Sequence, residues 1–223
     1  TADDFVTYYP VGSEPVVDNE TVFEARYSGD VLKEQLDVDH ATHDLPNGNF
    51  ETGDLTGWTG DALFAVSDAD EYFADFYPDN VPKYNKEGQY FLSSEGDAGA
   101  VGSTTSKAFR VEGSRYISFR LGGNKTENLS LSLMQWMEDG DDVEIARFNN
   151  NMFSDPYRSF GMTKYVYEIP EQYADAVCYF VLTDTANADT SFGVLTADDF
   201  VTYYPVGSEP VVDGKESFYA SFC

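Results

Sequence analysis

The chain has 223 residues, of which 40 are acidic and 13 are basic, and its formal charge at pH 7 is −27. Nucleic acids and anionic membranes carry charge of the same sign, so neither is expected as a partner. Aromatic residues make up 16% and hydrophobic residues 42% of the chain, which excludes a disordered acidic tail. No apolar run reaches the length of a membrane-spanning helix, so membrane insertion is not expected.

Short strand patterns separated by turn residues run along most of the chain. In RYISFRLG (115–122), Tyr116, Ser118 and Arg120 face one way and the apolar residues between them face the other. One apolar and one polar face are typical of antiparallel sheets, and the Asp-Gly pair at 139–140 predicts a hairpin. Strands are predicted, in chain order, at 63–67, 89–94, 107–111, 115–122, 129–137, 144–148, 163–169, 176–184 and 198–204.

Helical patterns are few, with two turns predicted at 29–36 and one at 170–176. Many short strands with turns between them predict an all-β fold, a jelly-roll β-sandwich of antiparallel strands with little helix. Cys178 lies in the apolar run AVCYFVL and is predicted to be a buried core residue.

The first eighteen residues, TADDFVTYYPVGSEPVVD, occur again unchanged at 196–213. The residues between the two copies occur once, which predicts a window cut from a tandem array of domain-sized repeats. Residues 1–9 could then undergo strand exchange with a neighbouring copy, or displace residues 196–204. The predicted parts are the last strand and connector of a preceding repeat (1–18), an acidic linker (19–44), the β-sandwich domain (45–205), and a connector with the start of the next repeat (206–223).

The stretch LPNGNFETGDLTGWTGDALFAV (45–66) combines a glycine-rich turn with two large apolar anchors, Phe50 and Trp58. Asn49, Glu51 and Asp54 cluster oxygen atoms within the same turn. Calcium takes about six to eight oxygen ligands from carboxylates and carbonyls, so the stretch favours a calcium site. The alternative is that Glu51 and Asp54 are ordinary turn residues on an acidic surface.

The same stretch resembles the opening of β-sandwich carbohydrate-binding modules, and TADDFVTYY (196–204) resembles their last strand. Together with YNKEGQYFLSS (84–94), RYISFRLGGNK (115–125) and EIARFNNNMFSDPY (144–157), it is similar to the levan- and fructan-binding modules appended to bacterial levanases and fructanases and found in Gram-positive surface proteins. The resemblance covers about residues 45–204. It implies a jelly-roll sandwich with a structural calcium ion.

Carried over to this chain, the resemblance places the calcium ion between the first and last strands. Glu51 and Asp198 would hold it, with backbone oxygens around residues 53 and 54, and Asp199 is the neighbouring alternative to Asp198. We expect Asp198 and Phe200 to share a strand face, which would put the carboxylate at the rim of the core. The predicted metal residues are therefore Glu51, Asp54, Asp198 and Asp199.

A sugar site needs an aromatic face and a few fixed polar groups that bind hydroxyls. Arginines on strand faces stand out in a chain with so few basic residues, because charge-assisted hydrogen bonds hold hydroxyls well. Tyr84, Trp136 and Tyr157 are candidate aromatic platforms. The predicted cleft combines Glu87, Arg120, Arg147, Tyr157 and Arg158. The alternative is that the arginines only neutralise the acidic surface and that Trp58 and Trp136 belong to the core.

Catalytic motifs are absent from the sequence: there is no nucleophile elbow, phosphate-binding loop, paired-histidine zinc motif or cysteine pair. Two acidic residues at glycosidase distance would occur by chance among 40 acids. His40 and His43 could form a weak metal site, but a solvated linker is the simpler interpretation. We therefore predict that the chain is not an enzyme.

Two functions remain after these exclusions. The first is a non-catalytic module that binds a polysaccharide or surface glycan, a levan-type fructan in particular, repeated in tandem in a secreted or surface protein of a Gram-positive bacterium. The second is a calcium-stabilised structural or adhesive repeat of such a surface protein, with no sugar ligand. The repeat identity motivates the second function, and the resemblance motivates the first.

Overall fold

The computed structural model describes residues 35–94, 100–124, 126–149, 160–186 and 193–210. The predicted helix at 29–36, the first copy of the repeat, Tyr157, Arg158 and Cys223 lie wholly or mainly outside these ranges. The predicted domain boundaries therefore stay predictions. In the described part of the chain, no helix is both long and apolar enough to cross a membrane.

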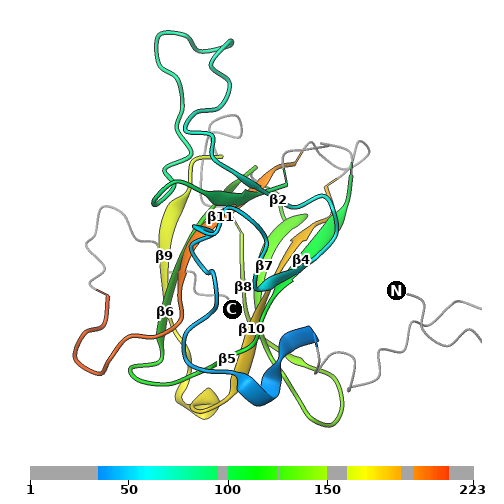
Figure 1. Ribbon diagram of the computed structural model, residues 1–223, viewed down its shortest axis with the longest axis vertical. Coiled ribbons are helices and arrows are strands. Elements are labelled where there is room, and N and C mark those ends of the chain that lie inside the picture. Colours follow the sequence, from blue (N-terminus) through cyan, green and yellow to red (C-terminus); the bar gives the residue numbers. More distant parts are fainter. Residues whose placement is uncertain (1–34, 95–99, 125, 150–159, 187–192, 211–223) are drawn as a thin grey trace, which may run out of the picture.

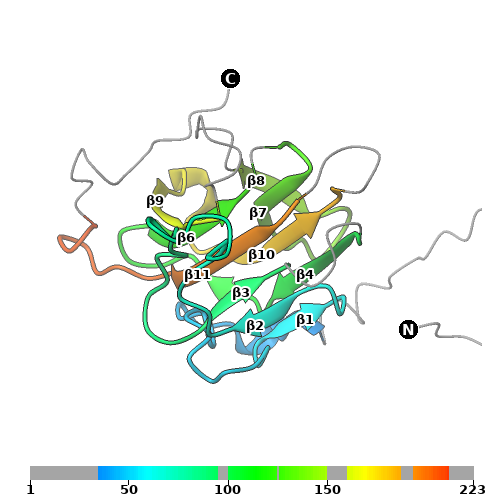
Figure 2. The same ribbon diagram turned by 90° about the horizontal axis from the view of Figure 1, so that it is seen from above.

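Two antiparallel sheets pack face to face (Figures 1 and 2). The first sheet has the order β1 (Trp58–Gly60), β4 (Gly102–Ser106), β10 (Val177–Asp184), β7 (Leu129–Gln135) and β8 (Val143–Phe148), and β5 (Phe109–Arg110) pairs with β10. The second sheet has the order β2 (Ala65–Ser67), β3 (Phe91–Ser93), β11 (Leu195–Val201), β6 (Tyr116–Gly123) and β9 (Thr163–Glu168).

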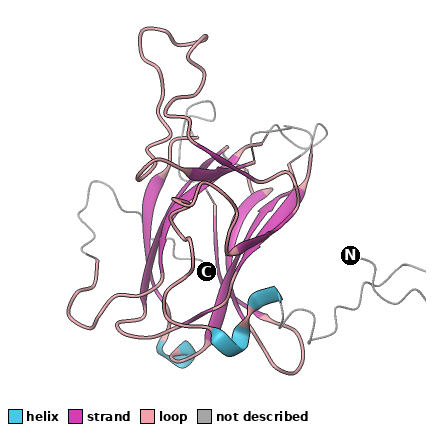
Figure 3. Cartoon of the chain, in the orientation of Figure 1, coloured by secondary structure: helices cyan, strands magenta, loops and turns pink. Residues whose placement is uncertain are grey.

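In the described part of the chain, helical structure is limited to short turns near one end of the sandwich (Figure 3). The described residues form two 3₁₀ helices, η1 (Val38–His40) and η2 (Glu171–Tyr173), and the second falls within the predicted turn at 170–176. The predicted fold class, an antiparallel jelly-roll β-sandwich with little helix, is confirmed. The hairpin predicted from Asp139 and Gly140 joins β7 to β8, and Gly140 has a positive φ of 89°.

The core forms between the two sheets from the apolar face of each strand. Phe119 of β6 is fully buried and lies within 6.2 Å, between ring centroids, of Phe148, Tyr165, Phe180 and Phe200. Its face is the one that the alternation in RYISFRLG predicts. The anchors Phe50 and Trp58 also pack against Phe200, as expected from the turn-rich opening segment. Cys178 is a free, buried thiol.

Two strands, β1 and β4, do not appear among the predicted strands. The sequence of β4 is GSTTS, which has no apolar alternation, although Thr104 and Ser106 are almost fully buried. Its backbone pairs with β1 on one side and β10 on the other. Pairing on both sides, rather than side-chain hydrophobicity, therefore makes this segment a strand.

A bulge in β11 overturns one expectation about Asp198. Asp199 adopts a left-handed backbone with φ of 50°, and the pairing with β6 shifts register between Asp198 and Val201. Ala197 and Phe200 both lie in the core, whereas Asp198 pairs with Arg120 on the opposite face. The prediction that Asp198 and Phe200 share a face is wrong, because the extra residue of a bulge resets the alternation.

The segment between β2 and β3 forms a second, smaller aromatic core outside the second sheet, and it stands beyond β2 in Figure 1. Tyr72 and Tyr84 lie 4.9 Å apart between ring centroids, and Tyr84 also packs against Phe91 of β3. Tyr84 is only 1% exposed. The expectation that it is an open sugar platform is therefore wrong, because its ring is part of this core.

Residues 35–44 pack on the outside of the first sheet, unlike the solvated linker expected there. Leu36 and Val38 are buried against Ala108 and Tyr179. The amide of Arg110 donates a hydrogen bond of 2.7 Å to the carbonyl of Thr42. Apolar residues in a polar segment thus cover a sheet face that would otherwise be exposed to water.

Candidate functional site

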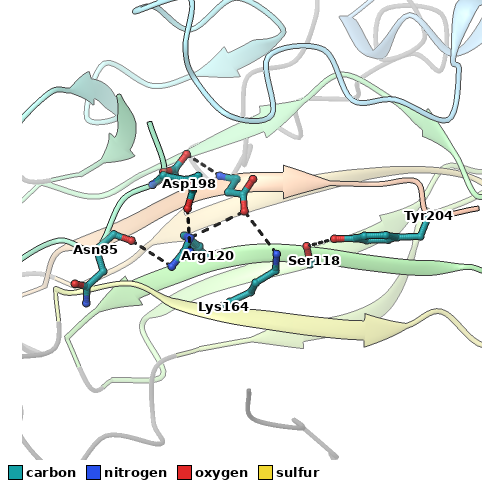
Figure 4. Close-up of polar contacts among 8 residues, drawn as sticks. Asn85, Ser118, Arg120, Lys164, Asp198 and Tyr204 are labelled. Carbon is teal, nitrogen blue, oxygen red and sulfur yellow. Dashed lines mark hydrogen bonds and ion pairs between the residues drawn. The ribbon is translucent and has the colours of Figure 1, made fainter. Parts of the chain in front are cut away.

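The loop at residues 85–88 meets β6 on the outer face of the second sheet (Figure 4). Arg120 projects from β6 away from the core, and its Nη2 lies 3.1 Å from Glu87 Oε2. Its Nη1 donates a hydrogen bond of 3.4 Å to the carbonyl of Asn85. Arg120 thus ties the loop to the sheet through both a side chain and a backbone atom.

Two aspartates of β11 complete this cluster on the next strand. Asp198 is fully buried, and its two carboxylate oxygens accept 2.7 Å hydrogen bonds from the amides of Glu87 and Asp199. Burial raises the pKa of Asp198 to about 7, and the two amides and Arg120 oppose that rise. Asp199 Oδ2 lies 3.8 Å from Lys164 Nζ and 4.0 Å from Arg120 Nε. Burial also raises the pKa of Asp199, against the effect of Lys164 and Arg120.

A carboxylate of the opening segment supports the same loop from another side. Glu51 Oε1 accepts hydrogen bonds of 2.8 Å and 2.9 Å from the amides of Gln89 and Tyr90. Gly88 has a positive φ of 70°, and a Cβ atom there would lie 2.5 Å from Glu51 Oε1. The loop therefore needs glycine at this position, and Glu51 and Asp198 hold its two sides.

A polar cavity of about 750 Å³ borders the loop. Its lining comes from the segment between β2 and β3 and from the loop itself: Asp70, Glu71, Ala74, Lys83, Asn85, Lys86 and Gly88. A second cavity of about 410 Å³ lies beside it and shares Lys83 and Asn85. The first volume falls in the range of small-ligand sites, and its walls offer charged and amide groups.

The two lysines of the large cavity play different parts. Lys86 is mostly buried, and its ammonium donates to the carbonyls of Asp68 and Gln89 and pairs with Asp70 at 3.1 Å. It fixes the cavity wall. Lys83 is exposed, and its ammonium has no ion-pair partner within the described ranges. Lys83 is therefore the cation at this cavity that a ligand can reach.

The structure brings together two of the five predicted sugar-site residues, Glu87 and Arg120. Arg147 lies on β8 of the first sheet, where its guanidinium pairs with Glu144 at 2.8 Å. Burial raises the pKa of Glu144, but hydrogen bonds from Arg147 and Ser132 outweigh it and hold the pKa below its ordinary value. Trp136, a candidate platform, is partly buried near Tyr179. Tyr157 and Arg158 lie outside the described residues.

Sequence reasoning missed the cavity-wall residues Glu71, Lys83 and Asn85. It also missed Lys164, whose ammonium lies 3.8 Å from Asp199. Glu71 and Lys83 pair through an isolated bridge in a segment without strand alternation. Asn85 immediately precedes the KEG sequence that carries Glu87. The feature of the sequence that could have predicted these residues is the density of charged and amide side chains from 83 to 87, next to Gly88.

The predicted metal residues fall into two groups. Glu51 and Asp198 converge on one loop, as described above. Asp54 accepts hydrogen bonds from the amide of Thr56 and from Thr52 Oγ1 within its own turn, and hydrogen bonding from Thr56, followed by that from Thr52, lowers its pKa. Asp199 faces two cations. Among the described residues, no three histidine, cysteine or acidic side chains gather closely enough for a metal ion. Glu51 and Asp198 are the two predicted metal residues that accept hydrogen bonds from backbone amides of residues 87–90.

Comparisons with known proteins find likenesses in structure alone. No family model matches the chain, and no curated protein matches it. A similar solved structure is the carbohydrate-binding module TmCBM61 in complex with beta-1,4-galactotriose, with 13% identity, a TM-score of 0.43, and coverage of 70% of this chain and 94% of that one. The CBM22-1 xylan-binding domain of Paenibacillus barcinonensis Xyn10C has 13% identity, a TM-score of 0.36, and coverage of 70% and 94%.

A third similar structure is the K3 cleaved adhesin domain of Lys-gingipain from Porphyromonas gingivalis, with 12% identity, a TM-score of 0.37, and coverage of 69% of this chain and 94% of that one. The three proteins differ in what their descriptions name: a galactotriose complex, a xylan-binding domain and an adhesin domain. At this identity and these TM-scores, the likenesses decide neither the ligand nor the activity of this chain.

Proposed function

We propose that this domain is a non-catalytic carbohydrate-binding module whose ligand occupies the cavity beside the loop at 85–88. The observation that carries the proposal is the joining of the 750 Å³ polar cavity to the Arg120–Glu87 ion pair through that loop. Charged and amide side chains with fixed positions suit hydroxyl groups, because each can make a charge-assisted or bidentate hydrogen bond. Glu71 and Lys83 face each other across an isolated β-bridge, so the cavity offers a hydrogen-bond acceptor on one segment and a donor on the other.

We further propose that the ligand is a fructan of the levan type and that the module is repeated in a secreted or surface protein of a Gram-positive bacterium. Two features of the sequence support this: the resemblance of residues 45–204 to fructan-binding modules and the identity of residues 1–18 with 196–213. Tandem copies raise avidity without any new contact. Binding by several weak sites therefore fits an open cavity without a deep apolar floor.

Isothermal titration with levan, inulin, β-1,4-galactan and xylan tests both the class and the choice of sugar. Lys83→Ala and Arg120→Ala should each weaken binding by roughly 10- to 100-fold, the loss expected for a charge-assisted hydrogen bond. Arg147→Ala is the matched control, since it removes an equivalent arginine–glutamate pair on the other sheet. The site is supported if the unchanged chain binds levan saturably, Arg147→Ala binds it with the same affinity, and Lys83→Ala and Arg120→Ala bind it more weakly. Binding to another glycan with the same variant pattern keeps the site and overturns the fructan.

A structural calcium ion is a separate proposal, with Glu51 and Asp198 as its ligands. Both carboxylates are fixed on the loop at 85–90, and both come from segments far apart in the sequence, so an ion there would join the opening segment to the last strand. Melting in millimolar calcium should occur at a higher temperature than in chelator, and Glu51→Gln should remove the difference. Equal melting temperatures in calcium, in magnesium and in chelator would exclude the ion.

The alternative function is a structural or adhesive repeat that holds a distal domain away from the cell wall. The unchanged repeat of eighteen residues favours it, since nearly identical neighbouring repeats are typical of extended arrays. A folded protein that binds none of the four glycans would support this alternative against the sugar-binding function. Calcium stabilisation is expected under both.

A further inference from the structure

The last strand of the sandwich occupies a place that a second segment of the same chain matches in sequence. β11 lies in the middle of the second sheet and pairs with β3 on one side and β6 on the other. Ala197 and Phe200 enter the core, and Thr196 Oγ1 donates to the carbonyl of Phe160 at 2.9 Å. The sheet is therefore incomplete without this strand.

The contacts of the segment continue beyond the end of β11. Thr202 Oγ1 donates to the carbonyl of His43 at 2.7 Å and accepts a hydrogen bond from the amide of Leu45 at 3.0 Å. Tyr204 forms a 2.7 Å hydrogen bond with Ser118 (Figure 4), and its carbonyl accepts one from the amide of Ser114. On the side of residues 196–204, these contacts are made by the side chains and backbone of the sequence TADDFVTYY.

Residues 1–9 carry that same sequence, TADDFVTYY. Asp3 matches Asp198, Phe5 matches Phe200, Thr7 matches Thr202, and Tyr9 matches Tyr204. A segment identical at every position can form the same core contacts, the same pairing and the same bonds to the loop at 85–88. In energetic terms, the place between β3 and β6 does not distinguish the two copies over these nine residues.

We propose that residues 1–9 can replace residues 196–204 between β3 and β6 within the same chain, so that the domain has two interchangeable last strands. Pro10 and Leu36, the first buried residue within the described ranges, are 26 positions apart, and an extended chain of that length reaches about 85 Å. It can therefore cross the base of the sandwich. Two segments joined by a connection of this length have an effective concentration in the millimolar range, well above that of a second molecule at micromolar concentration.

The start of β11 makes a core contact just before the repeated block. Leu195 is buried at the start of β11, and the identical block begins only at Thr196. Burial of Leu195 adds to the contacts that hold the resident strand in place. In an array, the same ambiguity would let each junction strand complete either the domain before it or the domain after it.

Substitution of matched residues tests the replacement. Phe200→Asp buries a charge in the core through the resident strand, and Phe5→Asp does the same through the copy. If the copy can substitute, Phe200→Asp should still unfold cooperatively in urea as a monomer, Phe5→Asp should behave as the unchanged chain, and the double variant should not fold. Phe119→Asp, a core position without a second copy, is the control and should not fold.

Three results for these variants would overturn replacement within the chain. Phe200→Asp that fails to fold, like the double variant, overturns the replacement, and so does a double variant that folds as well as Phe200→Asp. A folded dimer of Phe200→Asp overturns replacement within the chain and indicates strand exchange between copies. A disulfide provides a second readout: Thr196 is the pairing partner of Ser93, so Thr1→Cys and Ser93→Cys should cross-link in the Phe200→Asp chain with Cys223→Ser. Absence of this cross-link in a folded monomer also overturns the proposal.

Discussion

Phe119 lies where both sheets contribute aromatic rings to the core, and no part of its side chain is exposed. Phe119→Ala removes contacts with Phe148, Tyr165 and Phe180 and leaves a cavity, so it should lower the free energy of unfolding by about 3–5 kcal/mol. Urea denaturation measures the loss. Phe76 is 78% exposed, and Phe76→Ser should change the same quantity by less than about 0.5 kcal/mol. A small loss at Phe119 would contradict the close packing of the sheets.

Asp184 at the end of β10 is a buried carboxyl outside the candidate site. It is 1% exposed, accepts a hydrogen bond from Ser94 Oγ at 2.8 Å and another from the amide of Ala186, and burial raises its pKa above the ordinary value of 3.8. The folded state therefore binds the proton more tightly than the unfolded state. The contribution of Asp184 to the free energy of unfolding is largest below the ordinary pKa and falls as pH rises through the pKa of the folded state.

Asp184→Asn keeps the shape of the side chain without the titration. The difference in free energy of unfolding, unchanged chain minus variant, should fall as pH rises above the ordinary pKa of 3.8, and urea denaturation at a series of pH values from there to neutral pH measures the fall. Asn can accept from the amide of Ala186 and donate to Ser94 Oγ, so the fold should persist. A difference that stays constant with pH would show that the carboxyl titrates normally.

The junction between the opening segment and β11 depends on a close backbone approach at Gly48. The amide of Phe200 donates to the carbonyl of Gly48 at 2.9 Å, and a Cβ on residue 48 would lie 2.5 Å from the carbonyl oxygen of Phe200. Gly48→Ala must therefore push the opening segment away from the bulge, at a cost of about 1–3 kcal/mol. A drop in melting temperature measures it, and Asn49→Ala, on the exposed neighbour, should leave the melting temperature nearly unchanged.

Much of the element order could be predicted from alternation alone. The patterns at 115–122, 163–169 and 176–184 correspond to β6, β9 and β10 within one or two residues at each end, because each has one face in the core and one outside it. Burial of Phe50 and Trp58 could also be predicted, because large aromatic side chains in a turn-rich segment are stabilised by packing against the core. The local pattern of residues is sufficient to predict a strand where buried and exposed side chains alternate along it.

The remaining features depend on contacts that local patterns do not contain. β4 is polar and is a strand only because it has a partner on each side. The bulge at Asp199 moves Asp198 to the outer face, and no residue near it is a glycine that would have signalled the left-handed backbone. Arg120 and Arg147 look alike in sequence but lie on different sheets, so the membership of the candidate site follows from topology.

At the scale of the whole molecule, a charge of −27 on 223 residues makes self-repulsion a general term in stability. At about 10 mM salt the Debye length is roughly 30 Å, so charges across the domain repel one another, and at about 100 mM it falls to roughly 10 Å. Unfolding separates these charges. The melting temperature should therefore rise as sodium chloride is increased over this range, with calcium removed by chelator.

Choline chloride at the same ionic strength should produce the same rise, because screening depends on ionic strength and not on which cation carries it. At pH 5, where more of the carboxyl groups are protonated, the net charge is smaller and the rise should shrink. If sodium raises the melting temperature and choline does not, the cation is bound at a site instead of screening the surface. Because the stabilisation proposed for calcium is measured against this background, calcium and magnesium must be compared at equal ionic strength, and only an excess in calcium indicates an ion at Glu51 and Asp198.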